Sequence, residues 1–321
     1  MSLSRYWKTR VYISVRRKAG RHLPGSCAQW ASDKEEIMEK DLFLRKYRIE
    51  QEDFDAAGVS WEELTAIADH YATIEGKLRE IGKDFVDKYL YDIEKAGIHS
   101  YRYRTKAPGH LLEKIIRKKK EQPDKFAQLG VDNYWKYVTD LIGIRVFFLY
   151  REDWRHFHEY ITSAFENAPE QYVKDRERDF DNDETHCYIA ERPKVYRRNG
   201  DSRIYDENVI EIKSGGIYRS LHYIVKYRGY YVEIQARTLF EEGWSEVDHD
   251  IVYPYHKDDV MLRDFSRLLN RLSGMADEMS SYFRRMKVEK EIEEVLLGEY
   301  KEDKEAKLLA SMRELLGKEE R

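Results

Sequence analysis

The sequence predicts an α/β or α+β domain built on a mixed sheet, with helical segments before and after it along the chain. Strand-like runs of β-branched and aromatic residues alternate with runs of helical periodicity through the middle of the chain. The 321 residues are 41% hydrophobic and 13% aromatic, which is enough to form a sizeable core. No internal repeat occurs, so a repeat architecture is not expected.

Charge and cysteine content narrow the class of protein. Lys and Arg total 57 against 61 Asp and Glu, and this net charge of −4 excludes a wholly basic nucleic-acid coat protein. The two cysteines, Cys27 and Cys187, are too few for a four-cysteine zinc site or a disulfide scaffold, which favours a reducing, cytoplasmic location. No apolar run approaches the roughly 18 residues of a membrane span, so we expect no membrane association.

Residues 1–37 are predicted to be a basic leader. The first 32 positions hold seven Lys or Arg and no acid, a pattern typical of a transit peptide, a nucleic-acid arm or a disordered leader. We expect a disordered leader, or an upstream start codon with Met38 as the true one.

Residues 38–97 are predicted to form a helical N-terminal segment. Apolar residues between Trp61 and Leu78 recur at steps of three and four, the period of one buried helix face. Ser60 precedes this run, and with Glu63 it gives the pattern of a capping box.

Residues 98–256 carry the alternating pattern of the core. The predicted elements are strands at 98–104, 141–150 and 171–176, helices at 111–120, 153–165 and 239–252, and a hairpin of 223–228 with 230–235 around Gly229.

Residues 257–321 are predicted to be a C-terminal helical extension. One long helix runs to about residue 286 and continues into a tail, 287–321, with eight Lys or Arg and eleven Asp or Glu. Apolar residues in the tail leave two interpretations open, an amphipathic partner-binding helix and a solvated extension, of which we favour the second. Self-association through these helices is a further possibility.

A basic cluster is the first candidate for chemistry. Between His99 and Lys125 there are nine Lys or Arg against three acids, and the predicted strand ends at Arg104 and Lys106 just before a helix. Cations beside a helix N-terminus attract phosphate, and Lys114 projects from the same unit. The competing interpretation is a solvated charged face.

Acidic and polar residues on predicted strands form the second candidate. Asp140 stands at the edge of an apolar strand, where a carboxylate can meet a hard cation such as Mg²⁺. Alternation places Glu233, Gln235 and Arg237 on one strand face, which either lines a cavity or faces solvent.

Two glycines, Gly215 and Gly216, precede Tyr218. They either let the backbone approach a ligand whose base stacks on Tyr218, or form a tight turn.

Together these pieces resemble the synthetase domain of the RelA/SpoT family of alarmone nucleotidyltransferases. The matching segments occur in the family's order over about residues 98–255. They are Tyr103–Lys106 with Lys114, Arg117 and Lys118; Asp140–Arg145; Lys174 and Asp175; Tyr218–His222; Glu233–Thr238; and Trp244 through Asp248 and His249 to Tyr253.

The resemblance implies an α+β fold, with a mixed five-stranded sheet flanked by helices and related to nucleotidyltransferases. It also implies roles for particular residues. Arg104 would stack on adenine and Lys106 and Lys114 would hold the ATP phosphates, while Arg145 either joins this ATP site or is structural. Asp140 and Glu233 would engage Mg²⁺, with Glu233 also a candidate base, and Lys213, Tyr218, His222, Gln235 and Arg237 would shape the acceptor pocket.

The chain departs from the family pattern in two segments. The family's Lys-x-x-Gly-Tyr is one residue longer here, at Lys213–Tyr218, and a segment that is usually short becomes an insertion at about 177–212. Within the insertion, Asn199 and Gly200 predict a hairpin turn, and hence a basic β-arm near the acceptor site. The chain's length suggests a small, synthesis-only member.

The leading functional hypothesis is therefore a GTP pyrophosphokinase that converts ATP and GTP or GDP into AMP and pppGpp or ppGpp. A second hypothesis is a toxin-type member that pyrophosphorylates the 3′ end of tRNA, since the basic segments suit tRNA phosphates. A third is a nucleotide-binding regulator without activity, which the presence of both Asp140 and Glu233 disfavours.

Overall fold

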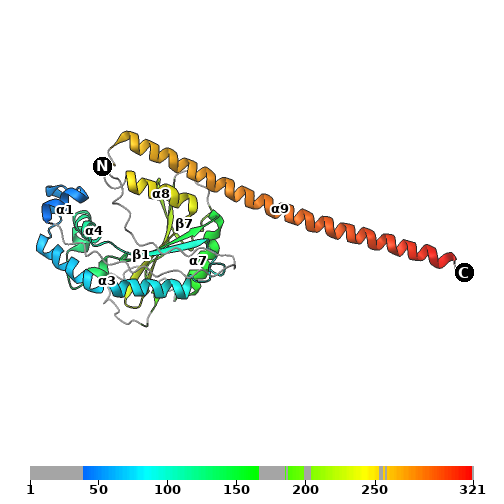
Figure 1. Ribbon diagram of the computed structural model, residues 1–321, viewed down its shortest axis with the longest axis horizontal. Helices are drawn as coiled ribbons and strands as arrows, with labels where there is room; N and C mark the ends of the chain where they lie inside the picture. The colour runs from blue at the N-terminus through cyan, green and yellow to red at the C-terminus, as the bar shows by residue number, and fades with distance from the viewer. Residues whose placement is uncertain are drawn as a thin grey trace, which may run out of the picture.

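The computed structural model describes residues 39–165, 185, 187–198, 204–252, 256 and 259–319, which form an α+β fold with helices on both faces of one mixed sheet (Figure 1). The helices are α1 (Lys40–Tyr47), α2 (Gln51–Ala56), α3 (Trp61–Tyr89), α4 (Pro108–Glu121), α5 (Pro123–Phe126), α6 (Tyr134–Tyr137), η1 (Arg151–Asp153), α7 (Trp154–Ser163), α8 (Leu239–Ile251) and α9 (Val260–Glu319). The strands are β1 (Ser100–Thr105), β2 (Ile142–Phe148), β3 (Tyr188–Ile189), β4 (Lys194–Arg198), β5 (Glu211–Gly216), β6 (Ser220–Tyr227) and β7 (Tyr230–Thr238).

The strand order is β1-β2-β7-β6-β4-β5, with β3 beside β6. Strand β2 runs parallel to β7, whereas β1–β2 and β6–β7 are antiparallel, so the sheet is mixed as expected. The predicted hairpin is β6–β7. Its two-residue turn has positive φ at both Arg228 (48°) and Gly229 (80°), the backbone that matches the twist of the flanking strands.

Alternation along the strands gives the sheet two different faces. Val232, Ile234 and Ala236 of β7 are fully buried, as are Ile142 and Ile144 of β2. Helices α3 and α7 cover this apolar face. The opposite face carries the polar residues between these positions, and α8 lies over it. The core therefore occupies one face and leaves the other available for chemistry.

The N-terminal helices follow the sequence pattern. Leu64, Ile67, Tyr71 and Leu78 are fully buried on α3. The Ser60 hydroxyl accepts a hydrogen bond from the Glu63 N–H at 3.1 Å, which satisfies one free donor at the helix start.

The inserted segment is not the hairpin arm that Asn199 and Gly200 predict. Strands β3 and β4 belong to it and account for two strands beyond the five expected. Strand β4 joins the sheet between β6 and β5 and pairs with β5 in parallel, which a tight hairpin turn cannot connect. Asn199 and Gly200 themselves lie outside the described residues, as do the leader at 1–37 and the strand expected at 171–176.

Helix α9 extends well beyond the domain (Figure 1). Its first half is held to the domain by polar side chains. Trp244 donates to Ser266, Asn270 donates to the Ile217 carbonyl at 3.0 Å, and Ser281 donates to Glu152 at 2.9 Å. No helix among the described residues is long and apolar enough to cross a membrane.

Candidate active site

Strand register brings the predicted site residues together on the polar face of the sheet. Across the strands, Arg104 lies opposite Gly143, and Gly143 is paired with Glu233. The next row of the same face holds Arg145, Gln235 and His222. Residues that oppose each other across strands share a face. The polar groups therefore line up from β1 through β2 and β7 to β6.

Gly143 leaves space in the first of these rows. A Cβ added at this glycine would meet nothing nearer than the Arg104 side chain and carbonyl oxygen, both at 4.0 Å. A glycine inside a strand often marks the place where a ligand approaches the backbone closely. Gly143 is paired with Arg104 on one side and with Glu233 on the other, so the open space beside this glycine lies between those two residues.

Asp140 is held between two lysines just before β2. Its Oδ2 accepts a hydrogen bond from Lys106 Nζ at 2.7 Å, and its Oδ1 lies 2.9 Å from Lys114 Nζ. Burial acts to raise the pKa of Asp140, but the two ammonium groups outweigh burial and hold that pKa well below its usual range. Lys106 follows β1 and Lys114 comes from α4, so the site joins three separate segments.

Glu233 stands on β7, in the centre of the polar face. Gln235 Nε2 donates to its Oε2 at 2.8 Å, and His222 Nδ1 lies 3.6 Å from its Oε1. Burial acts to raise the pKa of Glu233, yet the contacts with His222, and the charge of Lys114, lower it overall. Glu233 is therefore ionised at neutral pH.

After the side chains around Asp140 and Glu233, a third group of side chains is centred on Arg237. Its guanidinium is buried and donates to the Tyr218 hydroxyl at 2.7 Å, to Gln235 Oε1 at 2.6 Å and to Ser245 Oγ at 2.7 Å. The Tyr218 hydroxyl also lies 3.2 Å from His222 Nε2. Burial raises the pKa of Tyr218, so its hydroxyl remains protonated. Tyr218, His222 and Gln235 thus form one connected network with Glu233.

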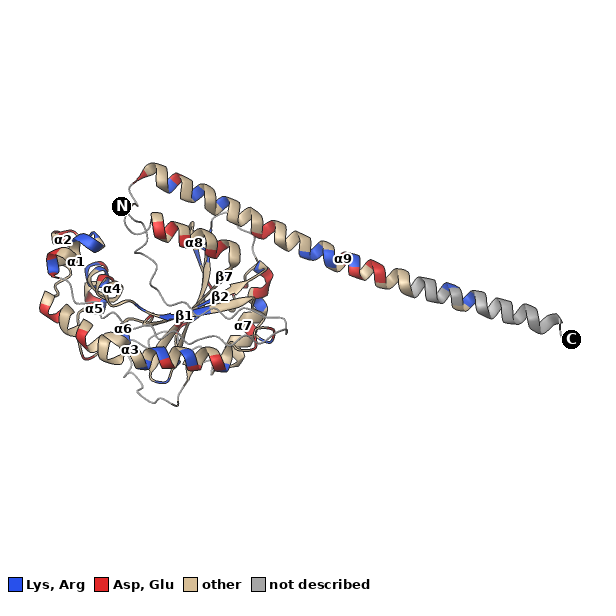
Figure 2. Ribbon diagram, viewed as in Figure 1, with Lys and Arg blue, Asp and Glu red and all other residues tan. Residues whose placement is uncertain are grey.

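Arg145 is brought to the same face, but α8 occupies its guanidinium. Arg145 Nη1 lies 2.8 Å from Glu242 and also contacts Glu246, and Arg102 pairs with the same two carboxylates. Figure 2 marks acidic positions along α8, which lies over the sheet, and basic positions on the strands. These contacts favour the structural alternative for Arg145. The two glutamates were missed from sequence, although their i, i+4 spacing puts both on one helix face.

Other predicted residues are not joined to this network. The Arg104 side chain is exposed, and its guanidinium makes no hydrogen bond or ion pair with another described residue. Lys213 is exposed on β5 at the far edge of the sheet, where it pairs with Glu211. On α4, Arg117 and Lys118 pair with glutamates of their own helix. These two residues therefore fit the competing interpretation, a charged helix face.

The carboxylates Asp140 and Glu233 fit a magnesium site that substrate completes. Within the described ranges, no group of three or more His, Cys, Asp or Glu side chains is arranged to hold a metal ion alone. Magnesium typically binds one or two carboxylates together with phosphate oxygens of a substrate. The donor set of this face is therefore of the right kind, provided that a nucleotide supplies the remaining oxygens.

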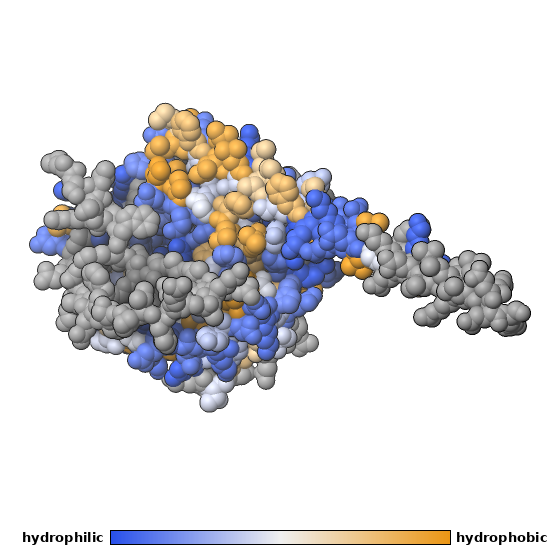
Figure 3. All heavy atoms as spheres, turned by 45° about the vertical axis from the view of Figure 1, so that its right-hand side comes forward, coloured by the Kyte–Doolittle hydropathy of each residue, from blue (hydrophilic) through white to orange (hydrophobic). Residues whose placement is uncertain are grey.

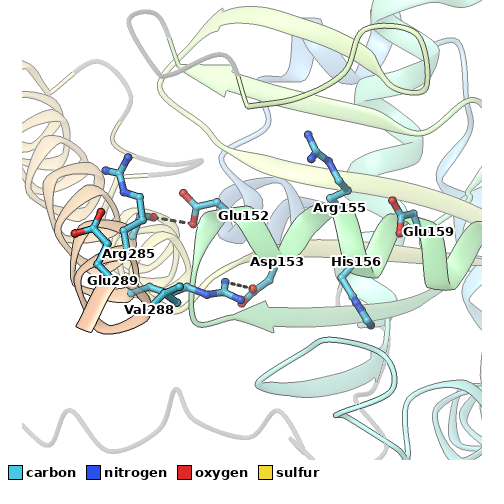
Figure 4. Close-up of a pocket in the computed structure, with 10 residues that line it drawn as sticks. Glu152, Asp153, Arg155, His156, Glu159, Arg285, Val288 and Glu289 are labelled. Carbon is cyan, nitrogen blue, oxygen red and sulfur yellow. Dashed lines mark hydrogen bonds and ion pairs between the residues drawn. The ribbon is translucent and has the colours of Figure 1, made fainter. Parts of the chain in front are cut away.

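A separate pocket of about 550 Å³ lies at the junction of η1, α7 and α9 (Figure 4). Asp153 and Glu159 line it beside Arg155 and Arg284, and it contains none of the predicted site residues. Within this pocket, an ion pair between Arg284 of α9 and Asp153 of η1 helps to hold α9 to the domain.

Comparison with known proteins identifies the region that carries the site. Residues 103–258 match the family model described as "Region found in RelA / SpoT proteins". These residues, just under half of the chain, are a RelA/SpoT region. The match includes every predicted site residue and lies close to the core expected at 98–256. No curated protein matches the chain.

Several solved structures resemble this chain in part. A GTP pyrophosphokinase family protein from Streptococcus pneumoniae is 20% identical, with 71% of this chain and 95% of that chain covered and a TM-score of 0.41. The small alarmone synthetase 1 from Bacillus subtilis is 20% identical over 71% and 98%, with a TM-score of 0.39. The same synthetase bound to its product pppGpp is 19% identical over 70% and 97%, with a TM-score of 0.38.

Proposed function

We propose that this chain is a (p)ppGpp synthetase, which transfers pyrophosphate from ATP to the 3′-hydroxyl of GTP or GDP. The observation that carries the proposal is the order of groups across one sheet face. The lysine-bound Asp140 lies on one side, the ionised Glu233 is central, and the Tyr218–His222 pair lies on the other side. Two nucleotides bound on either side would meet at Glu233.

The donor side consists of Arg104, Lys106, Lys114 and Asp140. ATP brings three phosphates, and the two lysine ammonium groups, now 2.7 and 2.9 Å from Asp140, are placed to bind them. The guanidinium of Arg104 is exposed and would stack on adenine.

The acceptor side consists of Tyr218, His222, Gln235 and Arg237. Arg237 and His222 hold the Tyr218 hydroxyl, which orients the ring as a platform for a guanine base. Gln235 and His222 contact Glu233 directly, so they are placed to orient an acceptor ribose at that carboxylate. We assign Lys213, on the outer strand, to an acceptor phosphate.

Transfer requires the 3′-hydroxyl to attack the β-phosphorus of ATP, with AMP as the leaving group. Glu233 accepts a hydrogen bond from that hydroxyl and takes its proton as the bond forms. Its lowered pKa makes it a weak base, so its larger contribution is to fix the hydroxyl in line with the phosphorus. Lys106 and Lys114 stabilise the negative charge that grows on the phosphate oxygens. A Mg²⁺ ion held by Asp140 and Glu233 would neutralise more of this charge.

We further propose that copies of the chain associate through α9. Seven residues of its outward face are each 52–63% exposed, and Figure 3 shows apolar side chains gathered there: Met261, Phe265, Leu268, Leu272, Met275, Met279 and Tyr282. Their spacing alternates between four and three, which is the heptad seam of a coiled coil. The polar face of α9 already contacts its own domain, so a second α9 is the partner that fits the seam.

Sedimentation velocity tests this association. Leu268→Glu with Leu272→Glu should convert the wild-type oligomer to a monomer, whereas Leu42→Glu, which alters an equally exposed leucine on α1, should leave the oligomer intact. A wild-type chain that sediments as a monomer at micromolar concentration would contradict the proposal.

A labelling experiment tests the proposed reaction. The purified chain is incubated with γ-labelled ATP and Mg²⁺, and GDP, GTP, ATP or deacylated tRNA is added in turn. We expect label in ppGpp and pppGpp, with one AMP formed per transfer. Label on tRNA alone would establish the toxin-type activity instead, and no transfer to any acceptor would favour the nucleotide-binding regulator.

A further inference from the structure

The inserted strand β4 adds an aromatic residue, Tyr196, to the polar face of the sheet. In the register, Lys194 of β4 lies opposite His222 and Tyr196 lies opposite Ser220. His222 in turn lies opposite Gln235 on β7. Because opposing residues share a face, Tyr196 is on the same side of the sheet as Glu233 and Gln235. The insertion therefore extends the acceptor side by one strand.

Ring contacts connect Tyr196 to the centre of the site. Its ring centroid lies 4.9 Å from that of His222 and 5.7 Å from that of Tyr218, with interplanar angles of 63° and 64°. His222 Nδ1 is 3.6 Å from Glu233. The His222 imidazole thus lies beside both Tyr196 and the central carboxylate.

Tyr196 and Tyr218 differ in what already holds them. The Tyr218 hydroxyl accepts from Arg237 at 2.7 Å, and the Arg237 guanidinium lies over the Tyr218 ring, 5.2 Å from its centroid. One face of the Tyr218 ring is therefore covered. Tyr196 is 36% exposed, and its hydroxyl makes no hydrogen bond with another described residue. An aromatic ring left open beside a polar site is suited to packing against a base.

We propose that Tyr196 is a second aromatic contact for the acceptor base: it packs against the edge of the purine that stacks on Tyr218, because the two rings are inclined at 64°. This inference rests on the proposed synthetase function, because it assigns the acceptor to this side of Glu233. It also gives the insertion a role, because its strand β4 places Tyr196 opposite Lys213 of β5, the residue that we assign to an acceptor phosphate. Competing with this assignment is a purely structural role, in which Tyr196 only packs β4 against β6.

Steady-state kinetics on the full chain separate the two roles. We expect Tyr196→Ala to raise the KM for GDP at least about five-fold, with the KM for ATP changed less than two-fold, as loss of one aromatic contact with the base predicts. Tyr196→Phe keeps the ring and should retain wild-type constants. Tyr91→Ala removes a tyrosine that is 79% exposed beyond α3 and should change neither constant.

Base selectivity gives a readout that packing alone would not move. Calorimetry with GDP and CDP should show the preference for the purine falling in Tyr196→Leu, a variant that keeps an apolar side chain on β4 if Tyr196→Ala does not fold. An unchanged preference, or equal rises in the KM values for GDP and ATP, would overturn the assignment of Tyr196. A wild-type chain that transfers nothing to GDP or GTP would instead overturn the synthetase function itself.

Discussion

The two sides of Glu233 use different chemistry to hold their groups in place. On the donor side, Lys106 and Lys114 are both held by one carboxylate, Asp140. On the acceptor side, Tyr218 is held by neutral and charged hydrogen bonds from a buried network around Arg237. The lysine charges are thus balanced within the protein, whereas the ring of Tyr218 is fixed by hydrogen bonds.

In the proposed synthetase, this difference would tell two similar nucleotides apart. The donor side offers cations, which act on phosphate charge regardless of the base. The acceptor side offers oriented rings and an amide, which act on the base and the ribose. Glu233 contacts the acceptor network directly and experiences the charge of Asp140 and Lys114, so it is coupled to both sides.

The largest expected effect comes from the residue between the two sides. Glu233→Gln keeps the shape of the side chain but removes the charge and the proton acceptor, so pyrophosphate transfer should fall at least ~100-fold. Initial rates with GDP as acceptor measure this. Glu80→Gln, on the exposed surface of α3, serves as the control. Near-normal turnover of Glu233→Gln would remove this residue from the mechanism.

Asp140→Asn is expected to have the next largest effect. It removes a carboxylate expected to bind magnesium and leaves Lys106 and Lys114 without their shared anion, so the rate should fall at least ~10-fold. The Mg²⁺ concentration needed for half-maximal rate should rise as well. Asp124→Asn, an exposed substitution on α5, should do neither. An unchanged magnesium requirement in Asp140→Asn would separate Asp140 from the metal.

The smallest expected effect concerns the support beneath the acceptor side. Asp277 of α9 is 1% exposed and lies 3.0 Å from Arg219, the neighbour of Tyr218. Burial, and then the charge of Glu241, raise the pKa of Asp277 to about 7. The folded state therefore binds a proton that the unfolded state has already lost, and the stability that this proton supplies disappears as pH rises toward 7 and above.

Thermal unfolding at two pH values tests this sign. Asp277→Asn should raise the Tm by about 2–4 °C at pH 8, where the wild-type carboxyl is charged, and should change it less at pH 5.5. Glu278→Gln, at the exposed next position, provides the control for a lost charge. A Tm difference that grows toward acid pH would contradict the shifted pKa.

Local patterns in the sequence predicted much of this arrangement. The alternation of Val232, Ile234 and Ala236 with polar residues gave the correct buried face of β7, because period-two alternation depends only on the strand itself. The steps of three and four gave the buried face of α3 for the same reason. The same period-two alternation along β7 put Glu233, Gln235 and Arg237 together on the opposite, polar face.

The sequence did not predict which residues that are distant along the chain would contact each other. The sequence of a strand does not show whether a basic side chain binds a phosphate or a carboxylate of the protein. Only the position of α8 in the structure shows that Glu242 and Glu246 hold Arg145. The parallel pairing of β4 with β5 is likewise a tertiary choice that Asn199 and Gly200 do not encode. Tyr196 gave no signal for this reason, since its ring contacts come from β6 and the loop before it, which lie apart from β4 in the sequence.

A crossed calorimetric measurement tests the division of the site most directly. Binding of α,β-methylene-ATP and of GDP is measured for the wild type, Lys114→Met and Tyr218→Ala. We expect Lys114→Met to weaken the ATP analogue at least ~10-fold and GDP less than two-fold, because it removes a phosphate contact. Tyr218→Ala should do the reverse, because stacking contributes about 1–3 kcal/mol. If either variant weakens both nucleotides equally, the two sides of Glu233 do not hold separate nucleotides.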